Sequence, residues 1–197
     1  MQESIVKSNF NTQNNPPKMK KKELRISSIY SRCLITRNIV LPITSIGKNI
    51  KETIEKEIEN RFEGKCIVEG FVKKNSAKVI TYSSGIIHGI NVSFEVVFEC
   101  EVCFPVEGML ISCVAKNITK AGIRAESANE SPSPIVVFIA RDHHYSNQQF
   151  SSIQEGDKFT GRVVGQRFEL NDKYVSIIAE LVNQPSDFSK AKPKIVI

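Results

Sequence analysis

The sequence contains no tryptophan, and none of its apolar stretches approaches the ~20 residues that a membrane-spanning helix needs. Its amino terminus also lacks the apolar core of a secretory signal peptide. We therefore expect no membrane partner and a cytoplasmic, nuclear or virus-associated protein. With 41% apolar and 24% charged residues, the 197-residue chain has the composition of a soluble folded protein. Its length fits one ordinary domain or two small ones.

Signatures of disulfides and zinc sites are missing as well. The five cysteines are an odd number without a secretory context, which indicates free thiols. Cys100 and Cys103 have CxxC spacing, but positions i and i+3 of an extended strand point to opposite faces. There is no second CxxC in the sequence. We expect buried thiols that act as small hydrophobic side chains, and no bound metal.

Catalytic motifs are also lacking. The sequence has no phosphate-binding glycine loop, no paired carboxylate motif and no nucleophile elbow. Asp142-His143-His144 is the one cluster that resembles a catalytic site, but adjacent residues of a strand point apart, and His88 lies in another part of the chain. We expect no catalytic residues and no cofactor. A small metalloenzyme built on the two adjacent histidines is a weaker alternative.

The net charge of +6 is concentrated at the two ends of the chain. Residues 1–25 carry six basic and two acidic residues, and residues 186–197 carry three lysines and one aspartate. The segments 26–107 and 108–185 are each neutral. We predict a disordered basic arm over 1–25, whose lysines serve as an import signal, as a phosphate contact or only as a solvated tail, and a basic tail over 186–197. A nucleic-acid surface on the folded body would need local segregation of charge.

Residues 90–104 alternate between apolar and polar side chains without a break. A period of two over this length predicts one long strand with its apolar face on a core and its acidic face in water. The strand stops at Pro105-Val106-Glu107-Gly108, where a second pattern rich in strands begins. The apolar positions are Ile90, Val92, Phe94, Val96, Phe98, Cys100, Val102 and Phe104.

The segment before this strand predicts a helix on an antiparallel sheet. Strands are expected at 29–40, 65–73 and 78–82, followed by a loop at 83–89. One amphipathic helix is predicted by apolar residues that recur every four positions, with Thr44 or Ser45 as its start and Gly64 as its end. These apolar residues are Ile46, Ile50, Ile54, Ile58 and Phe62.

After Gly108 the pattern changes to five short strands separated by turn residues. We place them at 109–118, 122–126, 135–140, 158–167 and 174–182. Five short strands in ~75 residues predict a small closed β-barrel of the OB type. The fold class is therefore α+β: a helix-on-antiparallel-sheet domain over 26–107, followed by a five-stranded OB-fold barrel over 108–185.

The order of these segments resembles the stalk subunit of multisubunit DNA-directed RNA polymerases, known as the seventh subunit of polymerase II and from its archaeal counterpart. The resemblance covers residues 29–183 and is carried by the order and spacing of the whole series. It includes Gly85-Ile86 before the long strand, Pro105 and Gly108 after it, Ser112-Cys113, Gly122-Ile123-Arg124-Ala125, the stretch from Ile135 to His144, and Gly156-Asp157-Lys158-Phe159.

The resemblance implies a non-catalytic subunit with two parts. The first would be a "tip" domain that docks on the largest polymerase subunits near the clamp and pairs with a smaller stalk subunit. The second would be an OB domain that contacts nascent RNA. The family segment that enters the polymerase core corresponds here to Ser84, Gly85, Ile86, Ile87, His88 and Gly89.

The sequence departs from strongly binding OB domains in one respect. Those domains carry an aromatic residue just after the glycine that matches Gly122, and here that stretch is Ile123-Arg124-Ala125. A base cannot stack there, and only Arg124 can cover a base or meet a phosphate. We expect modest, salt-sensitive RNA binding at a shallow surface formed by Lys116, Lys120, Arg124, Arg141 and His144.

A free-standing OB-fold RNA-binding factor in translation or RNA turnover is the alternative. Such a factor would not need the first domain, and we would expect it to carry positive charge and stacking aromatics. Nineteen lysines against eight arginines, with abundant Ile and Asn, suggest an AT-rich genome. A large DNA virus would place the protein in the virion and the host cytoplasm, whereas a eukaryote would place it in the nucleus.

Overall fold

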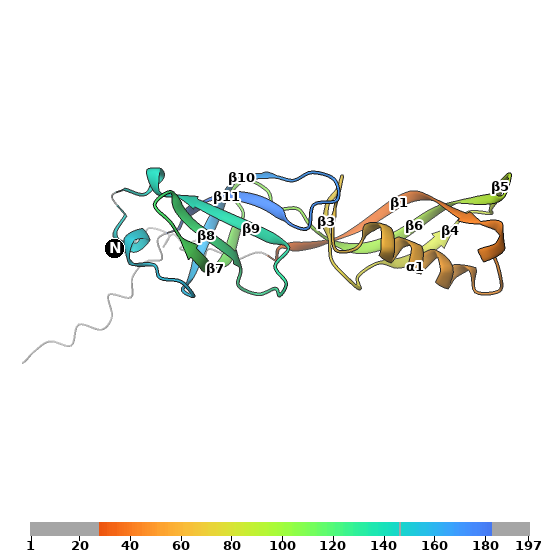
Figure 1. Ribbon diagram of the computed structural model, residues 1–197, viewed down its shortest axis with the longest axis horizontal. Helices are drawn as coiled ribbons and strands as arrows, with labels where there is room; N and C mark the ends of the chain where they lie inside the picture. Colours follow the sequence, from red (N-terminus) through yellow and green to blue (C-terminus); the bar gives the residue numbers. More distant parts are fainter. Residues whose placement is uncertain (1–27, 146, 183–197) are drawn as a thin grey trace, which may run out of the picture.

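The computed structural model describes residues 28–145 and 147–182, so the predicted arm and basic tail lie outside the described residues. The chain is mostly β-structure, and two sheets follow one another along the long axis (Figure 1). A closed barrel forms one end, and an open sheet with helix α1 (Ile50–Phe62) beside it forms the other. The division of the chain at residue 107 stays a prediction.

The open sheet is built around strand β6 (Asn91–Cys103). Strand β1 (Tyr30–Pro42) pairs with β6 in antiparallel register along its whole length, from Tyr30 opposite Cys103 to Pro42 opposite Asn91. On the other side of β6 lie, in turn, β5 (Ile86–His88), β4 (Lys78–Tyr82) and β3 (Gly70–Val72). Strand β3 also pairs with β2 (Cys66–Ile67).

The alternating pattern of the sequence determines which face of β6 is buried. Every second side chain from Val92 to Val102 is buried in one hydrophobic cluster, as the period of two predicts. The cluster ends where the strand ends, because Ile90 is 79% exposed and Phe104 is 46% exposed. The apolar pattern of the sequence therefore extends past the strand at both ends.

Helix α1 contributes Ile54 and Ile58 to the same cluster, and the ring of Phe62 stacks on Phe98 at 5.7 Å between centroids. The predicted start of the helix at Thr44 or Ser45 is wrong. Those residues belong to the short 3₁₀ helix η1 (Ile43–Ser45), and Ile46 is extended. The helix starts after Asn49 and ends before Gly64, whose φ of +72° is the left-handed conformation that favours glycine at this position.

The single strand expected at 65–73 is two short strands. A tight turn at Val68-Glu69 folds β2 back on β3. Gly70 follows the turn with a φ of +126°, and a Cβ there would lie 2.5 Å from the Cys103 carbonyl oxygen. Only glycine permits this close approach of β3 to β6.

Residues 110–181 form the closed barrel. Its strands are β7 (Leu110–Ile118), β8 (Gly122–Ser127), β9 (Ile135–Ala140), β10 (Lys158–Arg167) and β11 (Val175–Leu181). They close in the order β7-β8-β9-β11-β10, with β9 and β11 parallel and the other pairs antiparallel. This arrangement is consistent with an OB fold, and each of the five predicted strands is present.

Between β9 and β10 the chain forms two short helices that the sequence did not predict. These are the 3₁₀ helix η2 (Arg141–His143) and helix α2 (Gln148–Ser152). The side chain of Asn147 caps α2 by accepting hydrogen bonds from the backbone N–H groups of Gln149 and Phe150. Phe150 is thereby held in the barrel core, where it is 3% exposed.

The two parts of the chain are joined by more than their connecting segment. Cys66, Phe71 and Cys103 of the open sheet are buried in the core of the barrel. The backbone of Cys66 donates to the Asp172 carbonyl at 2.7 Å and accepts from the Asn171 N–H at 2.8 Å, which ties β2 to the β10–β11 loop. These bonds, together with the shared core, hold the barrel on the end of the sheet.

The cysteines show how closely the two cores approach one another. Cys100 packs in the core of the open sheet, whereas Cys103, three residues along β6, packs in the core of the barrel. All five thiols are free. Burial raises the pKa of Cys100, Cys103 and Cys113 to about 12, so each stays a neutral thiol at physiological pH.

Glu63 organises the turn that leads from β3 to β4. Its carboxylate accepts hydrogen bonds from the backbone N–H groups of Asn75, Ser76 and Ala77 at 2.6–3.0 Å. Glu63→Ala should lower the free energy of unfolding by about 2 kcal/mol, because it leaves these donors without their charged acceptor. Urea unfolding of the full chain measures this effect.

Glu55→Ala is the matched control, since the Glu55 carboxylate lies 4.0 Å from Lys51 in an exposed pair on α1. Its effect should stay within about 0.5 kcal/mol. Equal stability of the two variants would show that the Glu63 contacts do not hold the turn.

Candidate functional site

The segment predicted to enter a polymerase core lies at the far end of the open sheet. Residues 84–89 are all exposed. The segment was expected to be a loop, but Ile86–His88 form strand β5, which pairs with Asn91–Ser93 of β6. Gly89 and Ile90 form the two-residue turn of this hairpin. The φ of +61° at Gly89 matches a type II′ turn, in which glycine takes the first central position.

Two contacts fix the hairpin on the sheet. The backbone of Gly85 lies close against β6, because a Cβ at this position would come within 2.5 Å of Val92 Cγ1 and 2.9 Å of Phe94 Cε1. The Ile43 N–H donates to the Ile90 carbonyl at 2.9 Å and brings η1 beside the turn. The far end of the sheet is therefore ordered by backbone contacts rather than by a hydrophobic core.

Four large apolar side chains are left exposed there. We call this set the far-end apolar surface. Exposed isoleucines on a hairpin are costly in water and are typical of surfaces that bind a protein partner. The surface consists of Ile43, Ile86, Ile87 and Ile90, which are 46%, 61%, 66% and 79% exposed.

The residues predicted to bind RNA lie on the barrel, at the other end of the molecule (Figure 1). Arg124 points outward from β8, whereas its neighbour Ile123 is fully buried. Lys116 on β7 forms an ion pair with Glu126 at 3.7 Å. Lys116 and Arg124 line one shallow groove, and Lys120 lies with Arg141 at another.

The side chain of Arg141 is engaged in holding the β7–β8 turn. Its guanidinium donates to the carbonyl oxygens of Lys120 at 2.9 Å and Thr119 at 3.1 Å. It also lies over the ring of Phe150, 5.3 Å from the centroid. These contacts leave Arg141 little freedom to follow a ligand.

His144 is buried, with 7% of its surface exposed. Its Nδ1 lies 2.8 Å from the Ala140 carbonyl oxygen, and its Nε2 accepts a hydrogen bond from the Leu181 N–H at 3.0 Å. Only the neutral imidazole with its proton on Nδ1 satisfies both contacts. The ring stacks on Phe150 at 5.2 Å. His144 therefore closes the barrel, and we leave it out of the proposed RNA surface.

Sequence analysis missed one exposed aromatic residue on the barrel. Phe138 on β9 lies directly opposite Arg124 of β8 and is 37% exposed. The signal was present in the sequence, since Ile135, Val137 and Ile139 alternate as buried residues and leave Phe138 on the outer face. The barrel thus carries an aromatic ring beside Arg124 on the strand after the one where the family has it.

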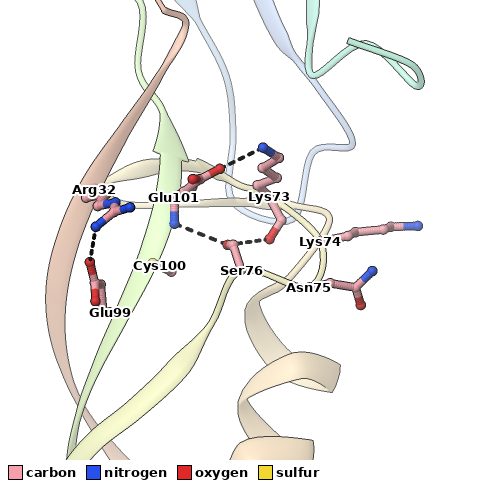
Figure 2. A pocket seen from close by; sticks show the side chains of 8 residues that line it. All are labelled: Arg32, Lys73, Lys74, Asn75, Ser76, Glu99, Cys100 and Glu101. Carbon is pink, nitrogen blue, oxygen red and sulfur yellow. Dashed lines mark hydrogen bonds and ion pairs between the residues drawn. The ribbon is translucent and has the colours of Figure 1, made fainter.

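A polar hollow of about 400 Å³ lies where the open sheet approaches the barrel (Figure 2). Arg32 pairs with Glu99 at 3.7 Å, and Lys73 pairs with Glu101 at 2.7 Å. The hydrogen bond to Glu101 raises the pKa of Lys73. Because these charges compensate one another, we assign no ligand to the hollow.

The Asp142-His143-His144 cluster does not converge on one point. Asp142 and His143 are exposed, Asp142 accepts a hydrogen bond from the Tyr145 hydroxyl at 3.1 Å, and His144 points into the protein. Within residues 28–145 and 147–182, no three His, Cys, Asp or Glu side chains are grouped so that they could hold a metal ion.

Substitution of the two adjacent histidines tests the structural assignment of His144. His144→Ala should lower the free energy of unfolding by about 3 kcal/mol, because it leaves the Leu181 N–H without its acceptor and opens space beside Phe150. His143→Ala, at the exposed neighbour, should change it by less than about 0.5 kcal/mol. Thermal or urea unfolding of the two variants decides the point, and similar stabilities would contradict the assignment.

Comparison with known proteins provides a viral relative. No model of a known protein family matches the chain. The chain is 26% identical over 164 residues to a protein of Acanthamoeba polyphaga mimivirus, and the match covers 75% of this chain and 79% of the viral protein. That protein is named "Putative DNA-directed RNA polymerase subunit". In the part of the chain that the structure describes, no helix has the length and apolar character that crossing a bilayer requires.

Proposed function

We propose that this chain is a non-catalytic stalk subunit of a DNA-directed RNA polymerase. The observation that carries the proposal is the similarity to the mimivirus protein, which extends over three quarters of the chain. The similarity supports a polymerase subunit, and the resemblance in the order of segments from Gly85 to Phe159 supports the stalk type. The alternative of a free-standing RNA-binding factor has no such relative in its favour.

In this proposal the open sheet is the tip domain. It docks on the largest polymerase subunits through the far-end apolar surface, and the segment Ser84–Gly89 lies at the contact. The exposure of the four isoleucines supports this role, because burying them against a partner removes apolar area from water. The backbone contacts at Gly85 and Ile43 support it as well, since a preformed hairpin loses little entropy on binding.

The barrel projects from the polymerase and contacts nascent RNA. Its distance from the far-end apolar surface supports this arrangement, because docking at one end leaves the other end free (Figure 1). The shared core at the joint fixes the direction in which the barrel points. A smaller stalk subunit would bind beside this joint.

We also propose that the protein is encoded by a large DNA virus and acts in the virion and the host cytoplasm. The mimivirus relative and the lysine-rich composition both support a viral source.

Affinity purification tests the proposal. Tagged full-length protein is expressed in cells where the gene is naturally active, and the recovered proteins are identified by mass spectrometry. We expect the two largest polymerase subunits in near-equal amounts. A variant with Ile86→Asp and Ile90→Asp should recover at least about tenfold less polymerase, because it places charge in an apolar interface.

Leu170→Asp is the matched control, since Leu170 is 64% exposed on the barrel and lies far from the hairpin. It should recover as much polymerase as the unchanged protein, and circular dichroism should show that all variants are folded. Recovery of ribosomes or RNA without polymerase subunits would refute the proposal and favour the free-standing factor.

A further inference from the structure

The outer face of the barrel carries a row of three side chains across neighbouring strands. The row consists of Arg124 on β8, Phe138 on β9 and Ile178 on β11. In the ladder, Arg124 lies opposite Phe138, and Phe138 lies opposite Ile178. Their neighbours along each strand are buried, so all three point away from the core.

The ring of Phe138 lies against the sheet rather than in the core. A Cβ placed on Gly122 would come within 3.1 Å of Phe138 Cζ, so the ring leans over a residue that has no side chain. Phe138 is 37% exposed. None of the ring–ring or cation–ring contacts within the described residues involves it. Phe138 therefore offers aromatic surface that is supported by backbone and accessible to solvent.

Arg124 stands between this ring and a shallow groove of about 370 Å³. Lys116 and Tyr174 also line the groove, and Tyr174 is 45% exposed. The carboxylates of Glu126 and Glu130 line it too, and Glu126 is paired with Lys116. Because the charges of the groove balance, stacking should contribute more to binding than general attraction of phosphates.

We propose that Phe138 and Arg124 form a platform for one base of single-stranded RNA. The base stacks on the Phe138 ring, and the Arg124 guanidinium reaches the adjoining phosphate or the edge of the base. The proposal rests on the proposed function only for the choice of RNA, which a polymerase supplies.

The surroundings of the platform favour a nucleic acid over a protein partner. The far-end apolar surface has four isoleucines within one hairpin and its neighbouring turn, as protein interfaces require. Around Phe138 the outer face is instead polar, with Arg124 beside it and Glu126, Ser176 and Glu180 on the same strands. A single aromatic ring next to a guanidinium is the arrangement by which proteins bind unpaired bases.

Fluorescence anisotropy of the full-length protein with labelled oligouridine of about 12 nucleotides tests the proposal at low salt. Phe138→Leu, which keeps an apolar side chain but removes the ring, should weaken binding between about fivefold and a hundredfold. Phe138→Tyr should restore the affinity to within about twofold, because it restores the ring. Val68→Ala, at a 72% exposed position in the open sheet, should leave the affinity unchanged.

An oligonucleotide that has the ribose-phosphate backbone but no bases separates stacking from charge. The unchanged protein should bind this strand as weakly as Phe138→Leu does, and Phe138→Leu should lose nothing further. Arg124→Ala should reduce the dependence of log Kd on log salt by about 0.7, the share of one phosphate contact on a single strand. Duplex RNA should bind poorly, since its bases are not accessible for stacking.

Equal affinity of Phe138→Leu and the unchanged protein for oligouridine would overturn the proposal. If Phe138→Leu instead lowered the recovery of another polymerase subunit, the outer face would be a protein interface, and the proposal would likewise be wrong. Neither result touches the proposed function, which is tested by purification through the far-end apolar surface at the opposite end of the molecule.

Discussion

Strand β6 is the constraint on which the rest of the structure depends. Its side chains from Val92 to Val102 are buried in the core of the open sheet, and Cys103, the next residue, is buried in the core of the barrel. One uninterrupted ladder with β1 supports the strand along its whole length. The bonds between Cys66 and the β10–β11 loop close the joint from a second side. The barrel and the hairpin are therefore held at opposite ends of one rod.

The two ends of this rod have different chemistry. The hairpin end presents isoleucines that water solvates poorly and that backbone contacts hold in place, which suits docking on another protein. The barrel end presents Arg124 and Phe138 on a face of balanced charge, which suits weak and adaptable contact with a strand that moves past. A stalk needs this division, because one end must stay bound while the other releases its ligand.

The sequence predicted those features that follow from local periodicity. The alternation at 90–104 predicted β6, and the spacing of Ile54 and Ile58 predicted the buried face of α1. It failed where tertiary contacts decide. Ile46 fits the helical spacing but lies in an extended segment before Asn49, and His144 is held by the Leu181 N–H, 37 residues away. Phe138 could have been found, because the alternation at 135–140 already placed it on the outer face.

A cryo-electron microscopy structure of the polymerase purified with this chain tests the central claim most directly. The account predicts that Ile86, Ile87 and Ile90 are buried against the largest subunits, and that the barrel stands clear of the core with its Phe138 face toward the emerging RNA. A complex in which the hairpin is exposed to solvent while the barrel is buried in the core would contradict it.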